Sequence, residues 1–442
     1  MENNQRLLTD IINGEARDFA LYTVENRAIP NLMDGLKPVQ RFVLHRAIQL
    51  GKSKPDDYHK LAGVAGAAAS LGYHHGEVSA QEAGALMANT WNNNCPILDG
   101  KGNFGSRLVQ KAAASRYIEC RVHDNFHKYF KDTDVAPTHK DDDHIPPAYY
   151  LPIIPMVLIN GVQGIGTGFA TNILPHSEAS IIECTKLALQ GKLDKEPQVQ
   201  FPQFKGAVVC NEENKYSLFG TYKLIGKTQI EITEIPYKYD RADYVENCLD
   251  VLESEGKIVS YDDNCGKHGF GFKVKLSKAF NLPEDEAKRH AYIIDKFKLK
   301  QDITQFIYTI DEVGELRAFQ SASELIRHFV EARKQFVQAR IDKKVEETRF
   351  NLQLAIAKAF FIRKVLDGVI VIKGKTRQEL KNEIITLGEP FATNVDALLS
   401  LNVYHMAEDE AIKLLERAQE AKSELEYWIS TDAVTEYMKD LG

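Results

Sequence analysis

The sequence predicts an α+β protein of several domains, and three observations support this class. The chain has 442 residues, which is more than one compact domain usually contains. Residues 201–320 hold runs in which apolar and polar side chains alternate, the pattern of β-strands. Residues 321–367 and 408–428 keep apolar side chains three and four positions apart, the pattern of long helices.

Composition excludes several broad classes of protein. Hydrophobic residues make up 44% of the chain and charged residues 26%, which rules out a disordered, collagen-like or rod-like chain as a whole. The six cysteines form no Cys-x-x-Cys pair, which favours free thiols in a reducing cytosol over a disulfide framework or a zinc site. The N-terminal stretch is polar and unlike a signal peptide, and prolines and glycines interrupt the apolar residues 149–170. We therefore expect a cytoplasmic protein with no membrane span.

Charge is distributed unevenly along the chain. The net charge of −7 excludes a uniformly basic nucleic-acid coat. Residues 27–60 nevertheless contain seven Lys or Arg against three Asp or Glu, and residues 101–131 contain seven against two. These two basic islands suggest one face that meets a polyanion, and chance clustering is the alternative.

The N-terminal third is predicted to be mainly helical. Residues 5–25 indicate a helix with one apolar face, interrupted near Gly14. Residues 27–135 mix short helical patterns with turn signals, which fits a compact α-rich domain. Within it, residues 61–71 are small and apolar and suit a close-packed helix.

The middle third is predicted to be a mixed α/β domain. A proline-containing hinge at residues 145–147 opens this region. A helix is expected over residues 241–255. The alternating runs predict strands over residues 216–224, 229–235 and 270–276.

The last third is predicted to be an antiparallel helical hairpin. Ser321 and Glu324 have the spacing of a capping box, and the helix after them would be a rod of roughly 70 Å. A second helix over residues 408–428 and a small globule at about 369–405 complete the hairpin. The end of such a rod is a natural place for self-association.

Three motifs suggest chemistry that their context does not support. Residues 100–105 satisfy GxGxxG, but the preceding residues make a poor parallel strand. Residues 220–228 resemble a phosphate-binding loop, but five residues separate the glycines and the segment has strand periodicity. The acidic run 139–144 is flanked by histidines and could hold a divalent metal, although a solvated surface loop is the more usual meaning of such a run.

Four segments together resemble the breakage–reunion (A-type) subunit of the type IIA DNA topoisomerases, the class that includes gyrase and topoisomerase IV. They are RAIPNLMDGLKPVQR (27–41), YHHGEVS (73–79), DGKGNFGS (99–106) and AAASRY (112–117). The resemblance continues through residues 159–172, residues 232–237 and the two long helices, so it spans nearly the whole chain. The chain length and the YHHGE variant are similar to the form that T4-type bacteriophages carry.

The resemblance implies a domain plan. It implies an N-terminal arm over residues 1–26 that contacts a partner and a winged-helix domain over 27–150 that carries the catalytic tyrosine. A tower domain would occupy residues 151–320. A coiled coil with an exit-gate globule would occupy residues 321–442.

Tyr117 is the predicted nucleophile. A tyrosine can attack a phosphodiester and form a phosphotyrosine ester, which divides one difficult step into two. Its ordinary pKa near 10 makes it a weak nucleophile at pH 7, so neighbouring cations are needed. Arg116 adjoins it, and the resemblance places Arg27, Lys37 and His75 around the same phosphates. The alternative for Tyr117 is a half-buried tyrosine on an amphipathic helix.

The resemblance also implies residues that hold DNA without taking part in the reaction. The resemblance makes His75, which precedes Gly76, a phosphate contact, although Tyr73 stands where bacterial relatives carry another histidine. Ile165 lies between two glycines and would wedge into a base step, unless it is a core isoleucine in a tight turn. With Ile165 and Lys37, the expected DNA-binding residues are Arg41, His74, Ser79 and Lys101.

The family plan assigns the remaining functions to other polypeptides. No ATP-binding segment and no metal-binding acidic cluster is recognised in the sequence. Mg²⁺ and ATP would therefore be bound by a partner subunit, with no metal site in this chain. Two copies of the chain would form a homodimer on double-stranded DNA, in the host cytoplasm if a phage encodes it. Relaxation and decatenation are expected rather than supercoiling. The alternative is a non-catalytic winged-helix dimer that organises DNA and would not need Arg116 or Tyr117.

Overall fold

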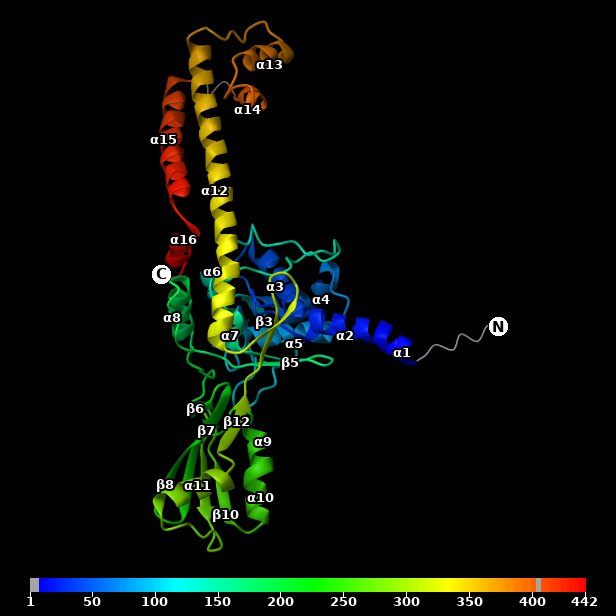
Figure 1. Cartoon of the computed structure of the whole chain (residues 1–442), viewed down its shortest axis with the longest axis vertical. Helices are drawn as coiled ribbons and strands as arrows, with labels where there is room; N and C mark the ends of the chain where they lie inside the picture. The colour runs from blue at the N-terminus through cyan, green and yellow to red at the C-terminus, as the bar shows by residue number, and fades with distance from the viewer. Residues whose placement is uncertain (1–7, 403–406) are drawn as a thin grey trace, which may run out of the picture. The chain divides into compact units, whose positions relative to one another are not determined.

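The structure is a computed structural model that describes residues 8–402 and 407–442, and Figure 1 shows its elements. It divides into two compact units. The first comprises the described residues up to Arg333 together with Leu441, and the second comprises residues 334–440 together with Gly442. The predicted mixture of helices and strands is confirmed.

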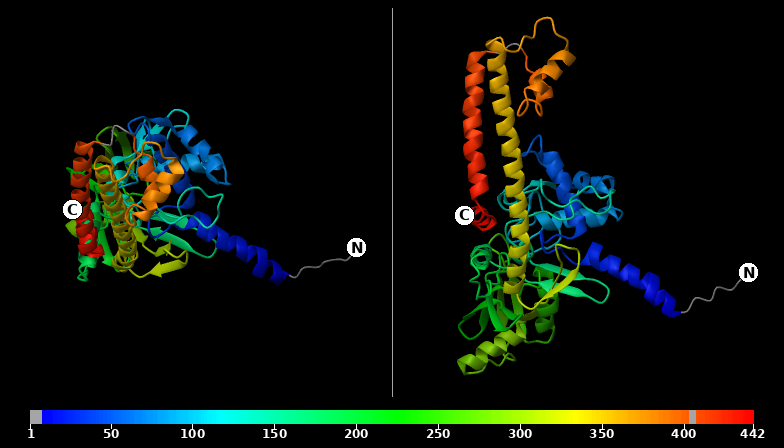
Figure 2. Two further views of the ribbon diagram at one scale, coloured as in Figure 1. Left: turned by 90° about the horizontal axis from the view of Figure 1, so that it is seen from above. Right: turned by 45° about the horizontal axis from the view of Figure 1, so that its top comes forward.

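The chain begins with an exposed helical arm. It consists of α1 (Leu8–Ile11), the π-helical turn η1 (Ile12–Ala16), α2 (Arg17–Thr23) and a second π-helical turn, η2 (Val24–Ala28). The predicted interruption is confirmed, because Gly14 has the non-helical angles φ −104° and ψ −108°. Burial begins only at Val24, and both views of Figure 2 show α1 and α2 projecting from the rest of their unit. Residues 5–7 of the predicted helix lie outside the described part of the chain.

A small helical domain with one short sheet follows the arm. Helices α3 (Pro38–Gly51), α4 (Leu61–Gly66) and α5 (Glu77–Ala88) pack together, and η3 (Ala67–Leu71) continues α4 as a 3-10 turn. The predicted close packing of residues 61–71 is confirmed, since a Cβ on Gly84 of α5 would lie 2.5 Å from the Leu61 side chain. The antiparallel sheet has the order β1 (His59–Lys60), β3 (Glu119–Val122), β2 (Leu98–Lys101).

A buried carboxylate joins the pieces of this domain. Asp34 is fully buried and accepts hydrogen bonds from the backbone N–H groups of Leu36 and Tyr150. It also forms an ion pair with Arg41 of α3, whose Nε lies 2.6 Å from Oδ2. The expected contact of Arg41 with DNA is therefore not supported: its guanidinium is buried and is used by Asp34 and by the carbonyl oxygen of Leu36.

The chain then forms a run of helices and one β-hairpin. These are α6 (Asp124–Tyr129), α7 (Met156–Asn160), the hairpin strands β4 (Val162–Ile165) and β5 (Ala170–Ile173), and α8 (Glu178–Leu189). The antiparallel pair β13 (Ile307–Ile310) and β14 (Leu316–Phe319) packs against β5.

The α/β region contains two antiparallel sheets. One has the order β12 (Lys300–Thr304), β7 (Lys215–Phe219), β6 (Ala207–Glu212). The other has the order β10 (Ile258–Asp263), β11 (Phe272–Leu276), β9 (Gln229–Glu234), β8 (Thr221–Ile225). The predicted helix over 241–255 is formed by α9 (Arg241–Tyr244), η4 (Val245–Leu249) and α10 (Asp250–Ser254), and it shares one core with the second sheet and α11 (Glu286–Lys296).

The prediction of a single strand over residues 216–224 is wrong. The run divides at Gly220, so that β7 and β8 belong to different sheets. The N–H of Gly220 donates to the carbonyl oxygen of Leu299, and a Cβ at this position would lie 2.5 Å from the carbonyl oxygen of Glu234. Because the alternation of side chains continues across the glycine, periodicity alone does not reveal the break.

Two long helices dominate the C-terminal region. α12 (Ala322–Leu366) has 45 residues, and α15 (Glu408–Ser430) has 23, as predicted. From residue 334 onward α12 runs beside α15 in the opposite direction (Figures 1 and 2). The predicted capping box is half confirmed: Ser321 Oγ accepts from the N–H of Glu324, but the Glu324 carboxylate accepts from the N–H of Gln320 instead of Ser321.

The predicted globule between the long helices has its own small core. α13 (Arg377–Thr386) and α14 (Val395–Leu399) pack together, and α16 (Ala433–Asp440) follows α15. Residues 403–406 of the predicted range lie outside the described residues. The core joins α12 to the globule through Ala357, Phe361, Ile370, Leu380, Ile384, Phe391, Val395 and Leu398.

Two further expectations from the sequence concern the cysteines and membrane spans. All six cysteines are free thiols, and four of them are buried. In the described parts of the chain, no helix combines the length and the apolarity that a membrane span requires.

We predict that Arg41→Ala destabilises the first unit strongly. Removing one partner of a buried ion pair leaves an uncompensated charge, which costs about 3–5 kcal/mol. Denaturant unfolding followed by fluorescence measures the loss. Arg46→Ala is the matched control, because Arg46 lies on the same helix and donates to Gln49 rather than to the buried carboxylate. Equal losses in the two variants would contradict the assigned role of Arg41.

Candidate active site

Tyr117 lies on an exposed turn just before β3. Its backbone N–H donates to the carbonyl oxygen of Ala114 over 2.9 Å, and 66% of its surface is exposed. The alternative of a half-buried tyrosine on an amphipathic helix is therefore wrong. A phenol in this position can reach a large substrate without any movement of the core.

The turn is fixed from both sides although its tyrosine is exposed. Ser115 Oγ donates to Gln81 Oε1 of α5 over 2.7 Å. The carbonyl oxygens of Ser115 and Ile118 accept from the N–H groups of Ala62 and Leu61 at the start of α4. The backbone around Tyr117 is thus held by two helices, which limits the positions that the phenol oxygen can take.

Two arginines supply charge that no carboxylate neutralises. The Arg116 guanidinium lies 4.6 Å from the centre of the Tyr117 ring. Arg27, at the end of the arm, is exposed. Neither forms an ion pair within the described part of the chain. Most other arginines of the basic islands do: Arg41 pairs with Asp34, Arg107 with Glu234, and Arg121 with Asp56 and Asp99.

His75 lies in a half-buried position in front of α5 (Glu77–Ala88). Burial lowers the pKa of His75, and the charges of Arg27 and His74 lower this pKa further, so the imidazole is neutral at pH 7. The Tyr73 ring meets the His75 ring edge-on at 5.3 Å. His74 and Ser79 are exposed beside it. The structure thus brings Arg27, His74 and His75 together, but no hydrogen bond, ion pair or ring contact among the described residues joins them to Tyr117.

Lys37 and Lys101, the two lysines predicted to contact DNA, differ in how their ammonium groups are engaged. Lys37 is half-buried, burial lowers its pKa, and its ammonium donates to the carbonyl oxygen of Gln163 over 2.8 Å. Lys101 is exposed but lies 3.4 Å from Glu119, which also pairs with Lys60 at 2.9 Å. Lys37 thus supports the β4–β5 hairpin, and Lys101 keeps a charge that Glu119 only partly neutralises.

Ile165 lies near the tip of the β4–β5 hairpin with 88% of its surface exposed. The alternative of a core isoleucine is therefore wrong. The two flanking glycines have a packing reason, because this side of the hairpin lies against the end of the arm. A Cβ on Gly164 would lie 2.0 Å from the carbonyl oxygen of Ala28, and a Cβ on Gly166 would lie 3.2 Å from the Val24 side chain.

Arg107 is a residue that the sequence analysis counted only as a basic charge. It is buried and donates to the Glu234 carboxylate and to the carbonyl oxygens of Ile235 and Tyr237. Its guanidinium also lies 4.3 Å from the centre of the Tyr237 ring. It thereby ties the loop before Tyr117 to the α/β region. In the sequence, the contact of Arg107 with residues 234–237 was indicated only by the presence of segments 99–106 and 232–237 among the motifs of the same family.

The three motifs with unsupported chemistry, residues 100–105, 220–228 and 139–144, do not have the local structure that this chemistry requires. β2 leads into a loop rather than a helix, and residues 221–225 form β8. His139 and His144 stack at 3.8 Å, burial lowers the pKa of His144 to about 4, and the aspartates between them are exposed. Over the described residues, no group of three or more His, Cys, Asp or Glu side chains is arranged to hold a metal.

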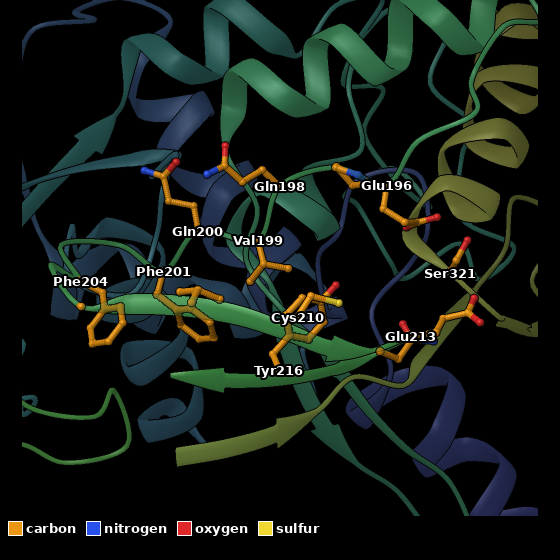
Figure 3. Close-up of a pocket in the computed structure, with 14 residues that line it drawn as sticks. Glu196, Gln198, Val199, Gln200, Phe201, Phe204, Cys210, Glu213, Tyr216 and Ser321 are labelled. Carbon is orange, nitrogen blue, oxygen red and sulfur yellow. The ribbon is translucent and has the colours of Figure 1, made fainter. Parts of the chain in front are cut away.

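Of the hollows in the first unit, one adjoins predicted site residues. Figure 3 shows a hollow of about 430 Å³ lined by Phe201, Phe204 and Tyr216, with Glu196 and Glu213 towards its other end, and no predicted site residue lines it. A second hollow, of about 590 Å³, is lined by Lys37, by residues 160–163 and by α5. The second one is continuous with the base of the Ile165 hairpin.

Residues 27–441 match the family model that describes the A-type subunit of DNA gyrase and topoisomerase IV. The chain belongs to this family. It is 56% identical over 441 residues to the DNA topoisomerase medium subunit of Enterobacteria phage T4, covering the whole chain and 99% of that relative. It is 30% identical over 398 residues to DNA topoisomerase 2 of Saccharomyces cerevisiae, covering 87% of the chain but 27% of the yeast protein.

A solved structure extends the match to the fold. The DNA-binding, cleavage and re-ligation domain of Plasmodium falciparum topoisomerase II superposes with a TM-score of 0.83 at 27% identity, covering 98% of this chain and 63% of that one. The resemblance found in the sequence is confirmed. The chain is a type II DNA topoisomerase subunit with the cleavage and religation role, and this excludes a non-catalytic DNA-organising dimer.

We predict that Gly164→Ala displaces the Ile165 hairpin. The new methyl group would overlap the carbonyl oxygen of Ala28, and relief of such overpacking costs about 1–3 kcal/mol. The measurement is the thermal unfolding midpoint. Gly63→Ala is the control, because nothing lies within 4 Å of a Cβ at that helical glycine. An unchanged midpoint in Gly164→Ala would show that the arm does not press on the hairpin.

Proposed function

We propose that Tyr117 is the nucleophile of DNA cleavage. The phenol oxygen attacks a backbone phosphorus and the bond from phosphorus to the 3′ oxygen breaks. The tyrosine is then linked to the 5′ phosphate, and the 3′ oxygen leaves with a proton. The ester retains the energy of the broken bond, so the reverse attack by the 3′ hydroxyl reseals the strand without ATP. The exposure of Tyr117 on a fixed turn beside Arg116 is the observation that carries this proposal.

Arg116, Arg27 and His75 are proposed to act on the charge of the phosphate. Negative charge builds on the equatorial oxygens during transfer, and fixed cations stabilise it most when they are not already neutralised. Arg116 and Arg27 meet this condition. His75 is neutral at rest and can donate an N–H to a phosphate oxygen. Lys37, His74, Ser79 and Lys101 are proposed to hold DNA without taking part in the reaction.

Magnesium and ATP belong to the chemistry of the family, and we propose that a partner subunit binds both. The carboxylate nearest to Tyr117 in sequence is Glu119, and Lys60 and Lys101 already engage it. The described residues thus do not fit a magnesium site beside Tyr117, and the roles assigned above to this chain's side chains do not depend on one.

The assembly is proposed to be a homodimer joined to further subunits. The arm (residues 1–26) exposes Phe19 and Leu21 and would contact a partner subunit. Residues 27–150 would be the winged-helix domain, 151–320 the tower and 321–442 the coiled coil and exit gate. The globule exposes Val369, Val371 and Ile372, which suits a contact between two copies. Such a complex on double-stranded DNA would relax and decatenate it in the host cytoplasm.

Tyr117→Phe tests the nucleophile directly. The substitution removes the attacking oxygen and leaves the ring beside Arg116, so DNA affinity should be unchanged. Covalent protein–DNA adducts, measured after denaturation in the presence of the partner and Mg²⁺, should be abolished. Tyr58→Phe is the control, since Tyr58 lies on the same small domain and donates its hydroxyl to Asp99. Adducts formed by Tyr117→Phe would sink the assignment.

Ile165→Ala tests whether the hairpin bends DNA. An exposed side chain contributes little to stability, so the melting temperature should stay within about 2 °C of wild type. Bending, measured by energy transfer between dyes at the DNA ends, should fall because no side chain then compensates for the unstacked base step. Wild-type bending by the variant would contradict the wedge role of Ile165.

A further inference from the structure

One side chain of helix α2 on the arm forms a direct contact with the candidate active site. The Tyr22 hydroxyl oxygen on α2 lies 2.9 Å from Nε2 of His75, although 53 residues separate the two in sequence. Their rings are 6.1 Å apart and tilted by 52°. Tyr22 is itself 43% exposed, so burial of an apolar surface does not explain this placement.

The two nitrogens of His75 have different surroundings. Nε2 is engaged by the Tyr22 hydroxyl, whereas Nδ1 has no hydrogen-bond partner among the described residues. The Tyr73 ring stands edge-on to the imidazole, so the ring is held by an aromatic neighbour as well as by a hydrogen bond. A new hydrogen bond from the His75 ring to a ligand would therefore use Nδ1.

The hydrogen-bonding chemistry of phosphate determines which tautomer of His75 can bind it. A phosphate oxygen only accepts hydrogen bonds, and a neutral imidazole carries a proton on one nitrogen alone. The proton must then be on the nitrogen that faces the phosphate. A phenol hydroxyl can donate to Nε2 or accept from it, and when it donates, the single proton of the neutral imidazole lies on Nδ1.

We propose that Tyr22 is a positioning residue that holds His75 in the tautomer with hydrogen on Nδ1 and so presents this N–H to the phosphate that is cleaved. The proposal rests on the proposed role of His75. It gives the arm a part in catalysis in addition to its expected contact with a partner subunit.

The backbone of the arm fits this role. After α2 the helix widens into the π-helical turn η2, in which the N–H of Ile29 donates to the carbonyl oxygen of Val24. Such turns are rare and often occur at functional sites. Arg27 lies in η2 and is close enough to His75 for its charge to lower the pKa of the imidazole. A single short segment therefore brings both Tyr22 and Arg27 to His75.

Nitrogen NMR of the imidazole rings tests the tautomer. In the full chain labelled with ¹⁵N-histidine, His75 is assigned by the signal lost in His75→Gln. Wild type should show the form with hydrogen on Nδ1, and Tyr22→Phe should move His75 towards the Nε2–H form that a free imidazole prefers. Tyr222→Phe is the matched control, because Tyr222 makes the same kind of bond, 2.8 Å long, to Nδ1 of His290. It should alter His290 and leave His75 unchanged.

Cleavage by the assembled enzyme tests the consequence. With Mg²⁺ and the partner subunit present, Tyr22→Phe should slow cleavage about tenfold, the lower end of the range seen when the outer partner of a metal-bound imidazole is removed, with DNA affinity unchanged. Tyr222→Phe should cleave at the wild-type rate. An unchanged tautomer of His75 in Tyr22→Phe would overturn the role of Tyr22 alone. The same conclusion would follow if Tyr22→Phe cleaved DNA at the wild-type rate while His75→Ala cleaved it slowly. Wild-type cleavage by His75→Ala would overturn the role of His75 itself, and that of Tyr22 with it.

Discussion

The site depends first on the buried carboxylate of Asp34. A charge in the interior is tolerated only when its hydrogen-bonding capacity is filled, and Asp34 receives donors from the backbone of Leu36, the backbone of Tyr150 and the Arg41 guanidinium. These donors belong to the loop after the arm, to α3 and to the segment before α7. The carboxylate thus fixes the point from which Lys37 reaches the Ile165 hairpin, and a surface ion pair could not do so.

The β4–β5 hairpin is positioned by close packing against the arm and by one lysine hydrogen bond. Its backbone lies so close to the end of the arm that Gly164 has no space for a side chain, and Lys37 holds the adjacent carbonyl of Gln163. The exposed Ile165 is therefore mounted on a rigid base. The arm contacts this base through Val24 and Ala28 and contacts His75 through Tyr22. One helical segment consequently touches both the hairpin that carries Ile165, the proposed bending residue, and His75, the proposed phosphate contact.

The sequence predicted what is periodic or carried by a short motif. The long helices followed from uninterrupted spacing of residues such as Leu325 and Phe329, and the family followed from the segments around Tyr117. It could not predict the break at Gly220, because the alternation of side chains is the same on both sides. Nor could it separate a buried arginine from an exposed one. Arg41 and Arg107 are buried because of Asp34 and Glu234, and the second of these partners is 127 residues away.

This distinction between arginines bears on the proposed contacts with a phosphate. The basic islands count fourteen Lys and Arg, but a charge paired with a carboxylate contributes little field beyond its partner. Arg27 and Arg116, which have no carboxylate partner among the described residues, lie beside His75 and Tyr117 respectively. An acidic chain can therefore still present unpaired cations to a polyanion at these two positions. The carboxylate pairing that builds the fold thus leaves Arg27 and Arg116, next to the proposed phosphate contact His75 and the proposed nucleophile Tyr117, among the island cations that keep their charge.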